Sequence, residues 1–261
     1  MLKTVTRALQ LLQVLGANPD GMSLAELAGV EATNKQDAFR LVKALAAFQF
    51  VSNDARTGKI ILGSGILHLA EKVKTQLDLW QIAVPTLTKL RDKTGETACL
   101  HVRAADKRVC ITQVESLDEL RCVSNIGQGL PLITGAPGRV FLAYLPPGER
   151  SRLLKSLNRL TDQTIVDCDG LLRLIENLRR DGYTVARDET VSGMAAVSAP
   201  VFDPSGNVIA AVTLLGPSQR LTRRRLTEHA APVREAARQV SEILSYGSDG
   251  RPISARTSAK Q

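Results

Sequence analysis

The segment from Asn34 to Lys43 combines a predicted helix start with polar side chains that can form paired hydrogen bonds to another molecule. Asn34 is a favourable helix cap, and Asp37 follows at the third helical position, where an acidic side chain stabilises a helix. In the major groove, glutamine pairs with adenine and arginine with guanine, while aspartate accepts from cytosine. We therefore expect Gln36, Asp37 and Arg40 to face base edges. For Asp37 a role as helix cap is an equal alternative, because its charge repels phosphate.

A second segment is suited to hold an anion. The sequence Thr134-Gly135-Ala136-Pro137-Gly138 leads into a helix expected over residues 137–145, with proline near its first turn. The bare amides of Gly135 and Ala136 would lie at the positive end of that helix. Such an end binds the carboxylate of a small ligand.

No pattern of catalytic or metal-binding residues is present in the sequence. The four cysteines form no CxxC pair, and the three histidines are isolated from one another. Gly63-Ser64-Gly65 is too short for a nucleophile elbow, and Gly127-Gln128-Gly129 lacks the rest of a dinucleotide fingerprint. We expect no enzyme activity, no metal and no cofactor, and we expect Cys99 and Cys110 to be buried, inert thiols in strands.

Charge and composition narrow the classes of partner. The net charge of +8 favours an anionic partner, yet residues 1–65 hold seven basic and five acidic side chains, so most of the surplus lies elsewhere. The most conspicuous basic cluster is Arg223–Arg225. We expect it to form a solvated helix face, and the alternative is a second DNA contact. With only five Phe, three Tyr and one Trp, base-stacking surfaces are disfavoured. No apolar run is long enough to span a membrane, and a cytoplasmic protein is expected.

The helices and strands that position these residues are predicted from the spacing of apolar residues and from capping and turn residues. Apolar residues recur at helical spacing between residues 5 and 15, and Ser23-Leu24-Ala25-Glu26 is a capping box that opens a short second helix. The helix opened by Asn34 is the third. Two short apolar runs, residues 50–52 and 59–62, flank a polar turn and predict a β-hairpin. This order predicts a winged helix-turn-helix.

Beyond residue 65 the pattern changes to α+β. A linker helix is expected over residues 67–77 and another over 78–94, which Pro85 should bend or interrupt. Strands are expected at 97–103, 108–115, 195–202 and 207–215, and helices at 137–145, 170–180 and 222–244. These elements predict an antiparallel sheet with helices.

Several short motifs, in this order, resemble the IclR-type transcriptional regulators of bacteria. The resemblance runs from Val5 to about Leu244, and its parts are Thr6-Arg7-Ala8-Leu9, Phe39-Arg40-Leu41-Val42, Asp54 to Leu62, Thr94-Gly95-Glu96-Thr97-Ala98, Pro131 to Gly138, Asp181-Gly182-Tyr183 and Ala199-Pro200-Val201-Phe202-Asp203. It implies a winged helix-turn-helix joined by a linker helix to a GAF-like antiparallel-sheet domain that binds a small effector, assembled as dimers or tetramers. The implied bounds are 1–64 for the DNA-binding domain, 65–78 for the linker helix, 79–246 for the effector domain and 247–261 for a disordered tail.

The resemblance also implies site residues. Phosphate contacts fall on Arg7, Lys35, Arg56 and Lys59, which position the protein without reading sequence. For each of these residues the alternative is a solvated surface charge. Effector contacts fall on Gly135, Ala136, Asp188, Met194, Ala196, Thr213 and Leu215. An exposed loop carboxylate beside Arg187 is the alternative for Asp188.

The chain departs from the family pattern at several positions, and these alter the expected operator and effector. Ala32-Thr33-Asn34 stands where Gly-Leu-Pro is frequent, Gln36-Asp37 where Ser-Thr is common, and Ile60 where the wing often has an aromatic residue. Ala196 and Leu215 are apolar where relatives that bind very small keto acids are polar. We therefore expect a regulator of double-stranded operator DNA controlled by a larger organic acid, such as an aromatic catabolite. The alternative is a GAF-like enzyme or signalling module without specific DNA binding.

Overall fold

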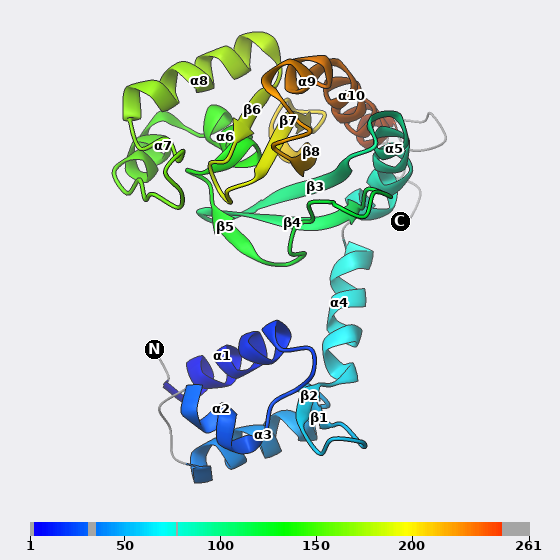
Figure 1. Cartoon of the computed structure of the whole chain (residues 1–261), viewed down its shortest axis with the longest axis vertical. Helices are drawn as coiled ribbons and strands as arrows, with labels where there is room; N and C mark the ends of the chain where they lie inside the picture. The colour runs from blue at the N-terminus through cyan, green and yellow to red at the C-terminus, as the bar shows by residue number, and fades with distance from the viewer. Residues whose placement is uncertain (1–2, 31–34, 77, 247–261) are drawn as a thin grey trace, which may run out of the picture. The chain divides into compact units, whose positions relative to one another are not determined.

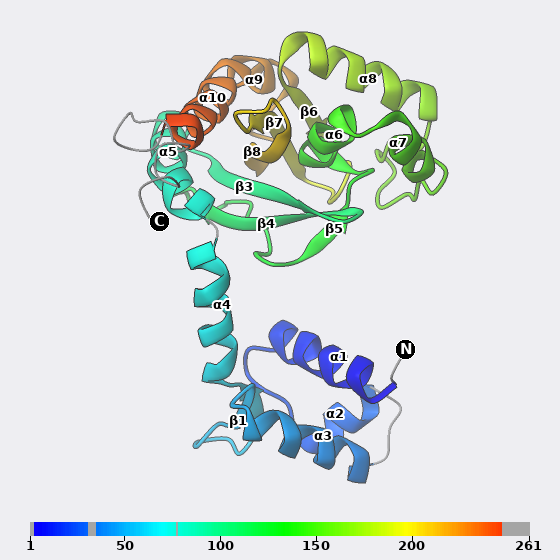
Figure 2. The same ribbon diagram turned by 180° about the vertical axis from the view of Figure 1, so that it is seen from behind.

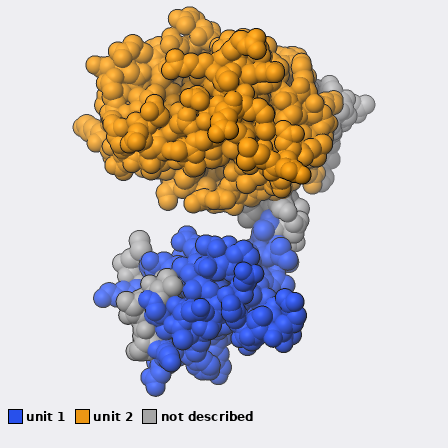
Figure 3. All heavy atoms as spheres, viewed as in Figure 1, with its two compact units in different colours: residues 1–78 blue, residues 79–261 orange. Residues whose placement is uncertain are grey.

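The computed structural model describes residues 3–30, 35–76 and 78–246 (Figure 1). The chain divides into two compact units, Met1–Asp78 and Leu79–Gln261, which are coloured separately in Figure 3. Two predictions, the helix cap at Asn34 and the disordered tail at 247–261, lie outside the described residues. Among the described helices, none combines the length and the apolar character that crossing a bilayer requires.

The N-terminal unit is a helix-turn-helix with a wing. Its elements are α1 (Lys3–Ala17), α2 (Leu24–Val30), α3 (Lys35–Ala47), β1 (Val51–Asn53), β2 (Ile60–Leu62) and α4 (Ser64–Gln76). The predicted capping box is confirmed: the amide of Ser23 donates to Glu26 Oε2 over 2.7 Å, and the amide of Glu26 donates to Ser23 Oγ over 3.3 Å. The box fixes where α2 begins.

One apolar cluster holds the three helices and the wing together. Helix spacing places the large apolar side chains of α1, α2 and α3 on the faces that meet, and the hairpin adds one residue from each strand. The backbone of Met22 exchanges two hydrogen bonds with Ile60, which extends the hairpin toward α2. The buried members of the cluster are Leu11, Leu15, Leu27, Leu41, Val51 and Ile60.

The C-terminal unit is built on one antiparallel sheet of six strands in the order β5-β4-β3-β8-β7-β6. The strands are β3 (Thr97–Ala104), β4 (Lys107–Val114), β5 (Gly129–Pro131), β6 (Thr184–Arg187), β7 (Met194–Phe202) and β8 (Val208–Pro217). The predicted turn between β7 and β8 is confirmed, because Asp203 Oδ1 accepts from the amides of Ser205 and Asn207. The predicted α+β class is confirmed.

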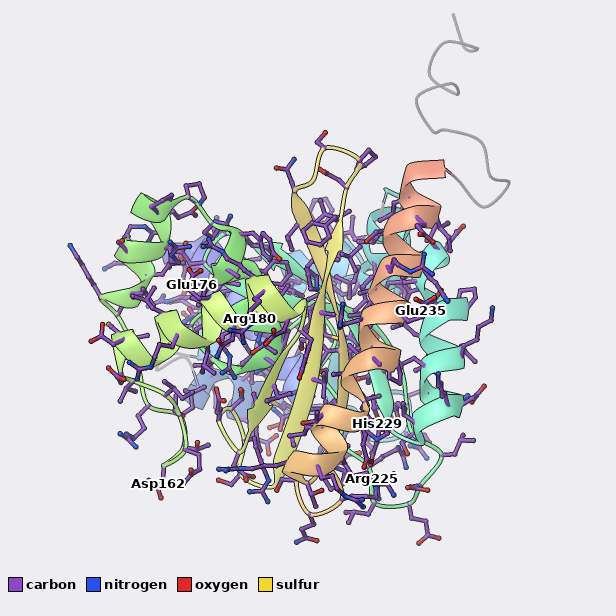
Figure 4. The ribbon with its side chains drawn as sticks, turned by 90° about the horizontal axis from the view of Figure 1, so that it is seen from above. Asp162, Glu176, Arg180, Arg225, His229 and Glu235 are labelled. Carbon is purple, nitrogen blue, oxygen red and sulfur yellow. The ribbon has the colours of Figure 1, made fainter. Side chains whose placement is uncertain are left out.

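Helices cover both faces of this sheet. They are α5 (Asp78–Thr94), α6 (Gly135–Tyr144), α7 (Pro147–Leu154), α8 (Cys168–Asp181), α9 (Arg223–Glu228) and α10 (Ala230–Tyr246). Figures 1 and 2 show α6, α7 and α8 grouped together and α5, α9 and α10 grouped elsewhere. Seen from above, α8 lies on one side of the strands and α10 with α5 on the other (Figure 4). The α6 and α8 group shares a buried cluster with Ala211 of β8.

Two predicted helices differ from the structure. Residues 222–244 were expected to form one helix, but the chain makes α9 and α10 with a break at His229. Pro232 explains the break, because it has no amide to bond the carbonyl of Glu228 and its ring disfavours an unbroken turn there. Pro85 was expected to bend or interrupt the helix over 78–94; the interruption is wrong, because α5 runs through Pro85 from Asp78 to Thr94.

Candidate functional site

The N-terminal half of α3 presents a polar face above a buried one. Ala38 and Leu41 are buried, whereas Lys35, Gln36 and Arg40 are exposed. Gln36 and Arg40 are four residues apart, so their side chains lie one above the other on the same face of the helix. Among the described residues, no hydrogen bond or ion pair commits the Arg40 guanidinium. This face is therefore free to meet an external partner.

Asp37 and Arg7 are less exposed than Lys35, Gln36 and Arg40. Both are half-buried, Asp37 in the first turn of α3 and Arg7 on α1. An acidic side chain in a first turn stabilises the positive end of a helix. The position of Asp37 is thus compatible with both of its predicted roles.

The wing turn is held rigid by one carboxylate. Asp54 Oδ1 accepts from the amides of Arg56 and Thr57 over 2.8 and 2.9 Å, and these hydrogen bonds lower the pKa of Asp54. Arg56 is exposed at the tip, and Lys59 is half-buried directly before β2. The turn therefore presents Arg56 on a fixed backbone.

The C-terminal unit contains a cavity of about 480 Å³ between the sheet and the start of α6. This volume lies in the range of sites that hold small organic ligands. Six of the seven predicted effector residues line it: Gly135, Ala136, Met194, Ala196, Thr213 and Leu215. They come from α6, β7 and β8, which are separated in sequence and brought together by the fold.

The start of α6 faces this cavity without a side-chain cap. The hydroxyl of Thr134, at the cap position, donates to the carbonyl of Pro131 and accepts nothing from the helix. Gly135 has a φ of 70°, a conformation that favours glycine. A Cβ at Gly135 would lie 2.7 Å from Thr190 Oγ1 and 3.3 Å from Arg108 Nη2. The bare glycine keeps open the space in front of the helix.

Asp188 is the exception among the predicted effector residues, because it is not among the residues that line the cavity. Its carboxylate is used within the loop between β6 and β7: Oδ1 accepts from the amide of Gly193 over 2.7 Å, and Oδ2 lies 3.3 Å from Arg187. Its φ of 60° is unusual for a residue with a side chain. In this structure the Asp188 side chain stabilises the loop. Its contact with Arg187 agrees with the alternative prediction, a loop carboxylate beside Arg187.

Arg108 is a cavity residue that the sequence analysis missed. It lies on β4, its side chain is only 6% exposed, and its Nε has no hydrogen-bond partner in the structure. A signal was available: Arg108 and Cys110 are two residues apart on one strand, so their side chains share a face. A charge at an inward strand position is rare without a partner.

His101 and the cysteines complete the sheet side of the cavity. His101 and Cys110 line it, and Cys99 and Cys110 are both buried in strands, as predicted. Burial, with the nearby charge of Arg108, holds the pKa of His101 well below its ordinary value. The imidazole is therefore neutral, and its Nδ1 has no hydrogen-bond partner in the structure.

A buried ion pair fixes the rim of the cavity. Arg139 Nη2 lies 2.7 Å from Glu189 Oε1 and also donates to the carbonyl of Val185 over 2.8 Å. The two charged side chains are 1% and 10% exposed. Because Arg139 belongs to α6 and Glu189 to the loop after β6, the pair ties the helix to that loop. Glu189 also lines the cavity.

A larger, more open hollow of about 790 Å³ lies between α8 and α10. Its charged groups are largely matched within the protein: Arg180 pairs with Asp181, and Arg238 pairs with Glu235 and Glu242. Arg180 and Glu235 are labelled on these two helices in Figure 4. Such matched charges leave little to recognise a charged ligand, so the smaller cavity is the better candidate.

The basic cluster Arg223–Arg225 forms the first turn of the six-residue helix α9 and is exposed. Thr222 caps the helix, and Glu228 lies 3.6 Å from Arg224 and 3.7 Å from Arg225. The structure therefore agrees with a solvated face.

Comparison with family models gives two matches that together cover most of the chain. Residues 71–242 match the model described as the bacterial transcriptional regulator IclR C-terminal domain, and residues 4–55 match the IclR helix-turn-helix domain. The helix-turn-helix match includes α1, α2 and α3. The C-terminal match includes every residue named above as lining the cavity.

Individual relatives agree with these matches. The HTH-type transcriptional repressor AllR of Escherichia coli K12 is 30% identical over 244 residues, which cover 93% of this chain and 90% of AllR. An IclR transcriptional regulator from Alicyclobacillus acidocaldarius is 27% identical with a TM-score of 0.80, over 94% of this chain and 99% of that one. An IclR homologue from Microbacterium hydrocarbonoxydans, solved as a complex with 4-hydroxybenzoate, shares the fold at 21% identity and a TM-score of 0.80, over 92% and 98%.

Proposed function

We propose, for a chain that belongs to the IclR family of bacterial transcriptional regulators, that a small organic acid bound in the cavity of the C-terminal unit controls its binding to operator DNA. The chain has the helix-turn-helix and the C-terminal effector domain of that family.

The observation that carries the proposal is the uncapped start of α6 inside the cavity. The first amides of a helix have no partner within the helix, and together they favour a negative charge. Here the Thr134 side chain accepts no hydrogen bond from these amides, and Gly135 leaves the space in front of them open. A carboxylate placed there would accept hydrogen bonds from Gly135 and Ala136.

The rest of the lining supports an acid with an apolar body. Met194, Ala196 and Leu215 face the cavity, whose volume of about 480 Å³ exceeds what a two-carbon acid fills. Burying an aromatic ring or an aliphatic chain against these side chains would stabilise the complex by about 25 cal/mol per Å² of apolar surface. That a protein of the same fold was solved with 4-hydroxybenzoate agrees with this size class.

On the DNA side, we assign base contacts to α3 and phosphate contacts to its surroundings. The exposed face with Gln36 and Arg40 would enter the major groove, with Asp37 beside it. Lys35, Arg56, Lys59 and Arg7 would meet phosphates. Two copies of the chain related by a two-fold axis would then bind half-sites about one helical turn apart, or a multiple of it.

Control by the acid requires that it bind one state of the regulator more tightly than another. The coupling free energy then equals the difference in binding between the two states, and it acts equally in both directions. An acid that weakens DNA binding would therefore itself bind less well when DNA is present.

Fluorescence anisotropy with labelled duplex DNA from upstream of the coding gene tests the proposal. The full-length protein is titrated alone and with each member of a panel of organic acids that runs from two-carbon keto acids to hydroxybenzoates. We expect specific binding that one or more of the larger acids changes at least fivefold. Binding that no acid alters would remove the effector assignment, and a response to two-carbon acids alone would refute the size argument.

A further inference from the structure

The cavity holds a buried cation that has no counterion among the residues that the structure describes. Arg108 is the only arginine among the residues that line the cavity, and no described residue forms an ion pair or a hydrogen bond with its guanidinium. The other deeply buried charged side chains of the described residues have partners: Arg139 pairs with Glu189, and the buried Glu96 accepts two hydrogen bonds from Arg220. Arg108 therefore differs from these buried charges, because no described residue pairs with it.

A buried charge without a partner is costly, and this arginine does not escape the cost by losing its proton. Burial lowers the pKa of Arg108 to about 10, so the guanidinium still carries its charge at neutral pH. Proteins retain such unfavourable groups where function needs them. An anion that enters the cavity would supply the missing partner.

The position of the guanidinium shows where that anion would lie. Arg108 Nη2 is 3.3 Å from the point at which a Cβ on Gly135 would stand. The guanidinium of β4 and the uncapped first turn of α6 thus face the same small space. Arginine matches the planar carboxylate with two parallel hydrogen bonds, so the two features reinforce each other.

The charges of the other ionisable groups around the cavity decide how many negative charges of a ligand the cavity can match. Glu189 is committed to Arg139, and the imidazole of His101 is neutral. Arg108 therefore leaves one positive charge to be matched. A second carboxylate in the cavity would have no cation to meet it, and its desolvation would oppose binding.

We propose that Arg108 anchors a single carboxylate at the start of α6, so that the cavity selects monocarboxylic acids over neutral and doubly charged molecules. The inference rests on the proposed function, because it concerns the same cavity. It names Arg108 as the residue that determines specificity, and it defines the class of effector by charge.

This role has a consequence for the protein without ligand. Arg108 is unpaired there, so its replacement by the unbranched, uncharged methionine removes a buried charge and should raise the unfolding midpoint. An arginine with a purely structural role would have the opposite effect. The single tryptophan, Trp80, lies on α5 of the C-terminal unit and reports the unfolding of this unit by fluorescence.

The experiment measures thermal unfolding of the full-length protein with benzoate, with neutral benzamide and with phthalate, the doubly charged relative. We expect benzoate to raise the midpoint of the wild-type protein and the other two to leave it unchanged. In Arg108→Met we expect a higher midpoint without ligand and a benzoate affinity about 10- to 100-fold lower. Arg103→Met is the matched control, since Arg103 lies opposite Arg108 on β3, is exposed and pairs with Glu149 outside the cavity.

Each outcome decides the inference. A benzoate response that survives Arg108→Met, a response to benzamide or phthalate as strong as that to benzoate, no response of the wild-type protein to benzoate, or a lower midpoint of ligand-free Arg108→Met would overturn it. Failure of the proposed function looks different: benzoate binding would depend on Arg108, yet no acid would change DNA binding. If instead a neutral molecule proved to control DNA binding, the regulatory role would stand and the role of Arg108 would fall.

Discussion

Replacement of Arg139 by methionine should destabilise the C-terminal unit severely. The change removes a guanidinium that is 1% exposed and leaves the carboxylate of Glu189 and the carbonyl of Val185 without their partner. Breaking a buried ion pair by removing one member costs about 3–5 kcal/mol, because the remaining charge stays buried and uncompensated. That is a large share of the stability of a typical domain.

Urea unfolding followed by Trp80 fluorescence measures this cost, since Trp80 is the only tryptophan and lies in the C-terminal unit. The matched control is Arg180→Met, which removes an arginine whose ion pair with Asp181 lies at the surface. We expect the midpoint of the control to stay within error of the wild type. A loss in Arg139→Met as small as that in the control would refute the reasoning.

A double-mutant cycle separates the ion pair from the packing of Arg139. The pair Arg139→Met and Glu189→Gln leaves no charge unmatched, so it should cost less than the sum of the two single changes. Strict additivity would show that the two side chains do not interact, contrary to their 2.7 Å contact.

Three further predictions concern the DNA-binding face, the α2 cap and pH. Arg40→Ala should weaken operator binding by about 1–3 kcal/mol and relax specificity at one base position, as measured by anisotropy with single-base operator variants; unchanged specificity would remove Arg40 from the base contacts. Ser23→Ala should destabilise α2 by about 1 kcal/mol, visible as faster amide hydrogen exchange at Leu27, whose amide donates to the Ser23 carbonyl; unchanged exchange would show that the capping box adds nothing. The neutral, buried His101 contributes stability that is present above about pH 6.5 and lost as the pH falls, because the unfolded chain then binds a proton that the folded one does not. His101→Gln should therefore flatten the slope of unfolding free energy against pH between about 6.5 and 5 by up to about 1.4 kcal/mol per unit, whereas a slope equal to that of the wild type would contradict the low pKa.

The sequence predicted the N-terminal unit well because its signals are local. The capping box at Ser23, the apolar spacing in α1 and α3 and the polar turn held by Asp54 each act within a few residues. Short edge elements carry weaker signals. Strands β5 and β6 have three and four residues and lie at the two edges of the sheet, and neither was predicted.

The cavity was predicted in part, and the failures there were not local. Motif positions indicated Gly135, Ala136 and the apolar wall, all of which line it. Asp188 does not line the cavity, because its carboxylate accepts from the Gly193 amide, a contact that depends on a loop with positive φ. Arg108 was missed because the absence of a counterion becomes visible only when strands and helix have been brought together.

The central claim is that one chain couples DNA binding by α3 to an acid in the cavity of its C-terminal unit. Its most direct test is the affinity of the full-length protein for duplex DNA from its own upstream region, measured across a range of salt concentrations with and without a monocarboxylic acid. We expect the logarithm of the association constant to fall linearly with the logarithm of the salt concentration, and the acid to shift the whole line. Failure to bind this DNA even at low salt would contradict the account.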